Sequence, residues 1–358
     1  MLTMAVALAV VVPISGPAAQ ETPEGRRPPD TGKMLRELQK FEDKSDKKGL
    51  KKHVLEDGTV MYTHGEDPPH SHTPVARSGQ LALSSSHYEC ADPGEPAIQL
   101  LHYWPAEKAN TVLADHVQQM FYTMAEDLGW EVRNRPPGGQ TFKYRVRCNA
   151  QGSPHVYYNW LPFPSTDPQY CCGDRFNRIV SALRSHGHVD SDTKYLVLID
   201  DRNAGGWGQG TFWNDSRLAG DNANNGEYGG GAAYAFSYGA YDVIGANHFR
   251  HELGHSMGAV NTDSPWSDQG AHCKLEWDVM CGGAQATIQW CPLPPPPYSR
   301  EGVFDCSQND YFYAGFPPSQ RYSYLQTHWN LGFCWNRFIS LYPYCQTDYN
   351  AYQWWYQR

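Results

Sequence analysis

The segment HFRHELGHSMGAVN, residues 248–261, contains the spacing HExxH. His251 and His255 are four residues apart, so on a helix both imidazole rings lie on one side and can bind the same metal ion. Glu252 lies next to them and can take a proton from a water molecule bound to that ion. Zinc lowers the pKa of such a water towards neutrality, so the motif predicts a zinc-dependent hydrolase with Glu252 as general base.

Two residues further along the chain extend the motif. Gly258 comes three residues after His255, where glycine allows the chain to leave a helix sharply and turn back under the metal. Met280 precedes a Cys-Gly-Gly turn in the segment EWDVMCGG. Together with HELGH, these residues resemble the metzincin clan of zinc peptidases, whose motif HExxHxxGxx(H/D) is followed by a Met-turn. The resemblance implies that Met280 packs beneath the metal and does not bind it.

The resemblance narrows to a group of secreted actinobacterial metzincin-like proteins. The segments that carry it are HELGHSMGAVN, HCKLEWDVMC, VFDCSQNDYF and YLQTHWNLGFCWNRFI, with KYLVLIDD upstream. The likeness covers about residues 79–340. It implies an α/β (α+β) fold of metzincin type, with an upper subdomain that combines a mostly parallel twisted sheet with the active-site helix, and a lower, irregular, disulfide-rich subdomain. The activity that it implies is the hydrolysis of peptide bonds in a protein or peptide substrate.

The third metal ligand is the point where this chain departs from the resembled clan. Most metzincins have His or Asp where this sequence has Asn261, and an amide oxygen is a weak zinc ligand. We prefer His272, in AHCKLEWDVM, because the neighbouring Cys273 would fix its position. Asp263 is the next alternative, since it lies two residues past the usual place. Asn261 itself, Glu276 and a water molecule stay open as well.

Hydrophobic periodicity predicts the elements that must position this site. Residues 98–104 (IQLLHYW), 142–148 (FKYRVRC) and 193–201 (TKYLVLIDD) have the composition of strands. Residues 111–132 and 174–187 have apolar side chains at helical spacing. Helix and strand therefore alternate in the first half of the chain, which favours an α/β layer.

A loop rich in Gly, Asn and Asp follows at residues 200–238. Long loops of this kind inside a domain are usually functional or disordered, and we interpret this one as a rim of the active site. Its side-chain oxygens could bind calcium, but the spacing of an EF-hand is absent. Ca²⁺ therefore stays an open alternative beside the Zn²⁺ that the histidine motif predicts.

Composition divides the chain into four parts. Residues 1–20 are apolar and then turn to small residues and proline, which predicts a signal peptide and a secreted, extracellular protein. Residues 21–78 are poor in apolar side chains, and we interpret them as a pro-segment or a disordered linker. Residues 79–345 would form the catalytic domain, and residues 346–358 an aromatic tail.

Three histidines lie in the polar segment before the catalytic domain: His64, His70 and His72. They could bind a metal, but in a segment this polar we expect them to be solvated. No later run of the sequence is long and apolar enough to span a bilayer, so we expect no transmembrane anchor.

The ten cysteines indicate an oxidising compartment, because their number is even and none lies in a CxxC pair. We expect disulfides between Cys273 and Cys281 and between Cys291 and Cys306 from their proximity, and between Cys90 and Cys148 from the layout of the resembled group.

The net charge of −9 gives no electrostatic case for a nucleic-acid partner. We expect a monomer that acts on a protein or peptide substrate. Two other classes stay open: a catalytically inactive metzincin scaffold that serves as a binding or surface protein, and a zinc hydrolase of a non-peptide polymer. Tyr311 and Tyr313 could donate to an oxyanion, but in a chain with 23 tyrosines we favour a structural role for both.

Overall fold

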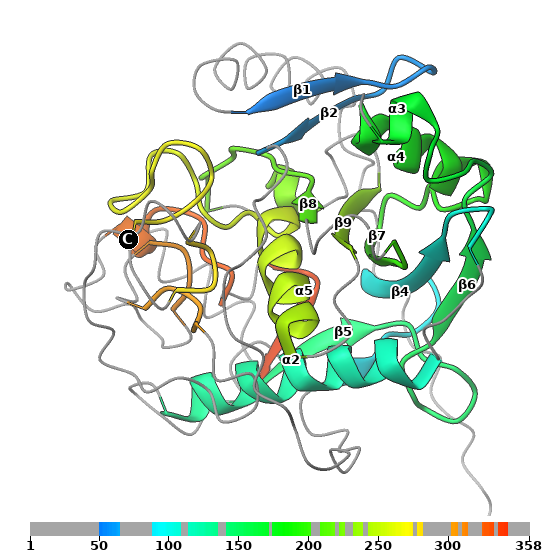
Figure 1. The fold of residues 1–358 in the computed structure, drawn as a ribbon. Helices are drawn as coiled ribbons and strands as arrows, with labels where there is room; N and C mark the ends of the chain where they lie inside the picture. The colour runs from blue at the N-terminus through cyan, green and yellow to red at the C-terminus, as the bar shows by residue number, and fades with distance from the viewer. Residues whose placement is uncertain are drawn as a thin grey trace, which may run out of the picture.

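A central sheet of eight strands forms the body of the protein (Figure 1). The computed structural model describes residues 50–64, 88–108, 114–134, 141–171, 174–201, 208–218, 222–225, 232–238, 243–274, 278–281, 302–306, 310–313, 324–332 and 336–342. The strand order is β10-β5-β4-β7-β9-β8, with β3 added on β5 and β6 on β4. The bounds of the strands are β3 (Tyr88–Cys90), β4 (Ala97–Trp104), β5 (Thr141–Val146), β6 (Val156–Trp160), β7 (Thr193–Ile199), β8 (Gly208–Gly210), β9 (Ala233–Tyr238) and β10 (Ile339–Tyr342).

The sheet is mostly parallel, which confirms the predicted α/β class. Strands β3, β4, β5, β6, β7 and β9 all pair in parallel, whereas β8 pairs antiparallel with β9 and β10 pairs antiparallel with β5. All seven residues of β7 are buried. A strand that is covered on both faces has a continuous apolar sequence instead of an alternating one, and this is why TKYLVLI was recognisable as a buried strand.

Helices cover both faces of this sheet. Helix α2 (Ala114–Asn134) and helix α5 (Val243–Ser256) share one hydrophobic core with Leu100 and Leu196 of the central strands. Helix α4 (Arg175–Ser185) shares the opposite core with Leu101 and Val197. Neighbouring residues of a strand point to opposite faces, so each central strand contributes to both cores in turn. A short helix, α3 (Pro168–Cys171), precedes α4.

Buried charged groups hold helix α5 at two positions, at Arg250 in its middle and at Ser256 at its C-terminal end. Arg250 and Glu131 of α2 form an ion pair in which neither side chain is exposed to solvent. The backbone N–H of Phe304 also donates to Glu131, at 3.1 Å. At the C-terminal end of the helix, the ammonium group of Lys194 on β7 donates to the carbonyl oxygen of Ser256. The last carbonyl groups of a helix receive no hydrogen bond from within the helix. A cation at the C-terminus donates to such a carbonyl, and its charge interacts favourably with the helix dipole.

Between α5 and β10, the residues that the structure describes form no strand and no α-helix, and their cysteines are disulfide-bonded. Cys273 is bonded to Cys281 and Cys90 is bonded to Cys148, which confirms two of the predicted pairs. Cys306 is also disulfide-bonded, but its predicted partner Cys291 lies outside the described residues. Among the cysteines of the described residues, none is free.

An antiparallel hairpin of β1 (Lys51–Val54) and β2 (Val60–Thr63) lies across the top of the molecule in Figure 1. Its turn contains Gly58, whose φ of 82° favours glycine. Leu55 and Met61 are buried in the core that also contains α4. Residues 50–64, part of the stretch 21–78 that we interpreted as a pro-segment or a disordered linker, are thus ordered and contribute two apolar side chains to a core. The hairpin obtains its buried surface from the domain on which it docks, and a local count of apolar residues cannot include that surface.

The two ends of the chain, residues 1–20 and 346–358, lie outside the described residues. Within the part of the chain that the structure describes, no helix combines the length and the apolarity that a membrane crossing requires.

The buried ion pair yields a prediction for stability. Arg250→Met would leave Glu131 charged and buried, so we expect the free energy of unfolding to fall by about 3–5 kcal/mol. Arg250→Met/Glu131→Gln removes both charges and keeps an acceptor for Phe304, so it should regain most of that loss. The matched control is Arg145→Met, which breaks a half-exposed pair with Glu89 and should cost only about 0–1 kcal/mol. Urea unfolding measures all three variants, and equal losses for Arg250→Met and Arg145→Met would contradict the prediction.

Candidate active site

The two histidines of the HELGH motif face each other in the core of the protein. His251 and His255 lie on α5, are almost fully buried, and have Nε2 atoms 3.0 Å apart. The Nδ1 atom of His251 contacts the carbonyl oxygen of Val279 at 2.6 Å, and that of His255 contacts the carbonyl oxygen of Ala259 at 3.0 Å. A carbonyl oxygen only accepts, so each Nδ1 carries the proton of its neutral ring.

This tautomer has a direct consequence for metal binding. In both neutral rings the Nε2 atom is then an acceptor, and the two lone pairs converge on one point. A cation placed between them removes the repulsion of the lone pairs. Two nitrogens bound tetrahedrally to one zinc lie about 3.3 Å apart, which is close to the distance observed here. The pair therefore fits a zinc ion, with the backbone carbonyls as the outer contacts that orient the ligands.

His272 lies beside this pair, as the sequence analysis predicted. The centroid of its ring is 4.9 Å from that of His255 and 5.3 Å from that of His251. The loop that carries it is fixed from both sides. The carboxylate of Asp268 accepts the backbone N–H of His272 at 3.1 Å, and the next residue, Cys273, is held by its disulfide to Cys281.

The other candidates for a third ligand lie in different surroundings. The carboxylate of Asp263 is at an exposed position and accepts hydrogen bonds from Ser216 at 3.0 Å and Tyr324 at 2.8 Å. Asn261 is fully buried, and its amide nitrogen donates to the carbonyl oxygen of Gly258 at 3.4 Å. Glu276 lies outside the described residues. Of the described candidates, His272 is the one whose ring packs against both helix histidines.

Met280 packs against helix α5 at Gly254, which lies between the two histidines in the sequence. A β-carbon added to Gly254 would be 2.5 Å from the sulfur of Met280, so a larger residue there would displace the Met280 side chain. Gly258 has a φ of 95°, as expected for a residue that turns the chain out of the helix. The same turn that places Met280 also presents the carbonyl of Val279 to His251. That carbonyl was missed by the sequence analysis, because a backbone group carries no residue-specific signal.

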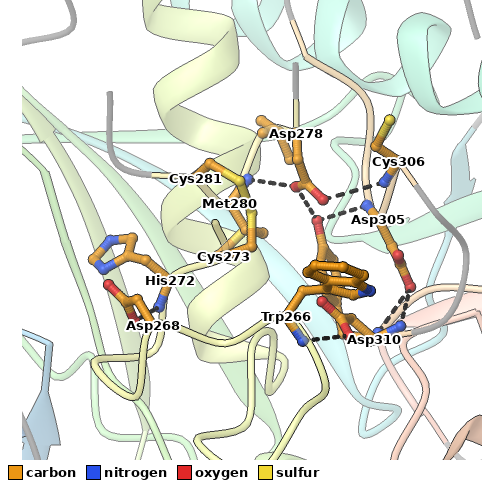
Figure 2. Close-up of a disulfide and its surroundings, with 12 residues drawn as sticks. Trp266, Asp268, His272, Cys273, Asp278, Met280, Cys281, Asp305, Cys306 and Asp310 are labelled. Atoms are coloured by element: carbon orange, nitrogen blue, oxygen red, sulfur yellow. Dashed lines mark hydrogen bonds between the residues drawn. A yellow bond between two sulfur atoms is a disulfide. The ribbon is translucent and has the colours of Figure 1, made fainter. Parts of the chain in front are cut away.

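A cluster of buried carboxyl groups supports this turn from the other side of the Cys273–Cys281 disulfide (Figure 2). Asp278 accepts hydrogen bonds from the hydroxyl of Tyr311 and from the backbone N–H of Met280, the latter at 2.9 Å. Asp305 accepts the backbone N–H groups of Tyr311 and two neighbours at 2.8–2.9 Å. Tyr311 is fully buried in this network, which agrees with the structural role that we favoured for it.

The carboxyl cluster has perturbed acidity. Burial, together with the nearby charge of Asp305, raises the pKa of Asp278 to about 7. The same two causes raise the pKa of Asp310 to about 9. Removing a carboxylate from water disfavours its charged form, and a second carboxylate nearby adds to that effect.

His64 lies in the site, which the sequence analysis did not foresee. We expected this histidine to be solvated, but its side chain is only 1% exposed. Its ring stacks on that of His255 with a centroid distance of 3.9 Å and meets that of His272 edge-on at 4.9 Å. One nitrogen each from His64, His255 and His272 lie within 4.8 Å of one another. The segment is polar and its histidines have no ligand spacing, so only the docking of the hairpin could reveal this position.

A second group of ligand-type residues does not form a metal site. Cys273, Asp278 and Cys281 lie close together, but the two sulfurs are bonded to each other. The calcium prediction falls partly on undescribed residues of the segment 200–238, which we expected to be one long loop but which contains strands β8 and β9. In the described part, Asp215 is engaged by Arg217 at 2.7 Å and by the backbone N–H of Ala223 at 2.9 Å.

No protein-family model matches this chain, and no curated protein matches its sequence. Among solved structures it is similar to OgpA from Akkermansia muciniphila. The catalytically inactive OgpA in complex with an O-glycopeptide (glycodrosocin) substrate is 13% identical, with a TM-score of 0.25, and the match covers 51% of each chain, about half its length. Two wild-type OgpA structures are 12% and 13% identical, each with a TM-score of 0.29, and the matches cover 68–70% of this chain and 69–70% of the OgpA chain. Values this low assign no function, which must come from the residues of this chain.

The raised pKa of Asp278 predicts a pH dependence of stability. Between about pH 4 and pH 7 the folded state keeps a proton on Asp278 that the unfolded state releases, so stability falls as the pH rises through this window. Asp278→Asn removes this proton uptake, and the fall should become smaller. Guanidinium unfolding at a series of pH values measures the slope, with Asp92→Asn at an exposed position as control. The same slope in Asp278→Asn and in the unmodified protein would show that the pKa of Asp278 is not raised.

Proposed function

We propose that this protein is a zinc-dependent endopeptidase of metzincin type. The observation that carries the proposal is the convergence of the Nε2 atoms of His251 and His255, with Glu252 adjacent on the same helix. His272 is the third ligand in this proposal, since its ring packs against both of the others. A bound Zn²⁺ would polarise the substrate carbonyl and lower the pKa of a water molecule.

The residues of the chain divide the remaining work. Glu252 is buried beside the histidines, where its carboxylate can take the proton of the attacking water and later return it to the leaving amine. The carbonyl of Val279 and the carbonyl of Ala259 hold the two histidine rings in the tautomer that leaves Nε2 available. Met280 and Gly254 fix the height of the helix above the turn. Together these contacts keep the site preorganised, which limits the reorganisation needed during the reaction.

The proposal of a peptide as substrate has support of its own. Residues Tyr62 to His64 run antiparallel to residues Gly210 to Phe212 at the edge of the sheet. The N–H of Phe212 donates to the carbonyl of Tyr62 at 2.9 Å, and Thr63 pairs with Thr211. An extended polypeptide can therefore add to this edge and reach the histidines, which is a recurring mode of peptide recognition. This observation favours a peptide over a non-peptide polymer.

The alternative of an inactive scaffold lacks a comparable observation. A scaffold without activity has no requirement for a buried carboxylate beside the histidine pair, and Glu252 is 1% exposed there. The disulfides Cys90–Cys148 and Cys273–Cys281 fit an oxidising compartment, and we propose that the protein acts outside the cell.

The first test of the proposed activity is Glu252→Gln. The amide keeps the shape of the side chain but cannot accept a proton, so hydrolysis of casein should fall by about 100-fold or more while bound zinc stays stoichiometric. Glu95→Gln, at an exposed turn position, is the matched control and should leave the rate unchanged. Metal analysis and a fluorogenic protein assay measure both quantities. A Glu252→Gln protein that hydrolyses casein at the unmodified rate would exclude Glu252 as the general base.

The second test concerns the third ligand. His272→Ala removes one imidazole from the site, so the affinity for zinc should fall by about tenfold or more. Asp263→Ala removes the next candidate, whose carboxylate binds Ser216 and Tyr324, and should leave the affinity unchanged. Competition with a chromogenic zinc chelator gives the dissociation constants. The opposite ranking of the two variants would assign the ligand to Asp263.

A further inference from the structure

We propose that His64 is a fourth protein ligand of the same metal ion, and that residues 51–64 are an internal inhibitory segment that keeps the site latent. This inference rests on the zinc site of the proposed function and assigns a regulation to it. The residue concerned lies outside the HExxH motif and its Met-turn, in a polar segment whose histidines we expected to be solvated.

The position of the His64 ring is the first argument. Its Nε2 atom is 3.4 Å from a carboxylate oxygen of Glu252, and both side chains are only 1% exposed. The ring is stacked on His255 and lies edge-on to His272, and one nitrogen from each of these three rings lies within 4.8 Å of the other two. A solvated histidine would lose its hydration on entering such a site, and binding to a metal ion offsets that cost.

Backbone pairing is the second argument, because it fixes how far the ring of His64 reaches into the site. Three successive residues of the segment pair with three successive residues of the sheet edge. The carbonyl of Tyr62 accepts from Phe212, and Thr63 forms a bridge with Thr211. The N–H of Gly210 donates to Nε2 of His64 at 3.3 Å. A β-carbon at Gly210 would be 2.7 Å from the backbone oxygen of Glu252. The edge that holds the segment therefore lies in contact with the catalytic helix.

The rest of the hairpin anchors it at a distance from the metal. Asp57 in its turn forms an ion pair with Arg184 of α4. His53 is buried, donates to or accepts from Thr63 at 2.9 Å and packs on Phe176 with a centroid distance of 4.5 Å. Arg184 and Phe176 lie on α4 and not on α5, so these two contacts hold the hairpin independently of the metal ligands.

The consequence for activity follows from zinc coordination. A catalytic zinc site has three protein ligands and one open position, whereas four protein ligands make a closed, structural type of site. With His64 bound, the position of the attacking water is filled and Glu252 faces an imidazole. The same three residues, Tyr62 to His64, also fill the sheet edge that we assign to the substrate. Displacement of the hairpin opens both positions at once.

The test compares His64→Ala with the unmodified full chain, both loaded with zinc. His155→Ala, which removes a histidine at an exposed position, is the matched control. X-ray absorption at the zinc edge counts imidazole ligands and should give four in the unmodified protein and in His155→Ala, but three in His64→Ala. Calorimetry with a small hydroxamate should show binding to His64→Ala that is about tenfold tighter or more, because the unmodified site is open only in a fraction of molecules. Hydrolysis of casein should rise by a similar factor in His64→Ala.

Each outcome has a defined meaning. Equal ligand counts and equal hydroxamate affinities in His64→Ala and the unmodified protein would overturn the role of His64 and leave the zinc peptidase intact. Absence of zinc from the unmodified protein, and from His155→Ala, would instead overturn the proposed function itself. Asp57→Ala supplies a second route to the same answer, since it weakens the anchor of the hairpin without touching a metal ligand. It should shift hydroxamate affinity in the same direction as His64→Ala but by a smaller factor, because a partly exposed ion pair contributes little, and a shift in the opposite direction would count against an inhibitory hairpin.

Discussion

Two backbone carbonyls determine the tautomer of the histidine pair, and therefore whether the pair can bind a cation. By accepting from Nδ1 of His251 and His255, the carbonyls of Val279 and Ala259 determine which nitrogen of each ring keeps its lone pair. The pair can then share one cation, and the rest of the site is arranged so that these carbonyls stay in place. The turn at Gly258 determines the position of the Ala259 carbonyl. The turn at residues 278–281 determines the position of the Val279 carbonyl.

The residues around the turn at 278–281 support that turn. The Cys273–Cys281 disulfide closes it, and the buried network of Asp278, Asp305 and Tyr311 holds its backbone amides. This arrangement places several carboxyl groups in a small apolar volume, which raises the pKa of two of them. The groups that hold this turn therefore include buried acids whose protonation affects stability.

Under the proposed latency, the segment of residues 51–64 would connect regulation with recognition. Its residues Tyr62 to His64 lie along the sheet edge beside β8, which an extended peptide would also use, and the ring of His64 stacks on that of His255. Inhibitory segment and substrate would therefore compete for the same backbone hydrogen bonds as well as for the same position at the metal.

The sequence by itself determined the elements and the chemistry that depend on local spacing. The i, i+4 histidines, the glycine turn after the helix and the apolar run of β7 all follow from helical or strand geometry over a few residues, and the structure agrees with each. The disulfide between Cys273 and Cys281 could be predicted for the same reason, since the two residues are only eight positions apart in the sequence. His272 was chosen by its neighbourhood to this pair, and it lies beside the other two rings.

Only the tertiary structure decided which groups distant in sequence meet at that helix. The carbonyl of Val279 has no residue-specific signature, and the buried pair of Arg250 and Glu131 joins positions 119 residues apart. His64 was assigned to solvent because its segment lacks apolar residues of its own. Its burial depends on a surface that other parts of the chain build, and composition within a segment contains no information about such a surface.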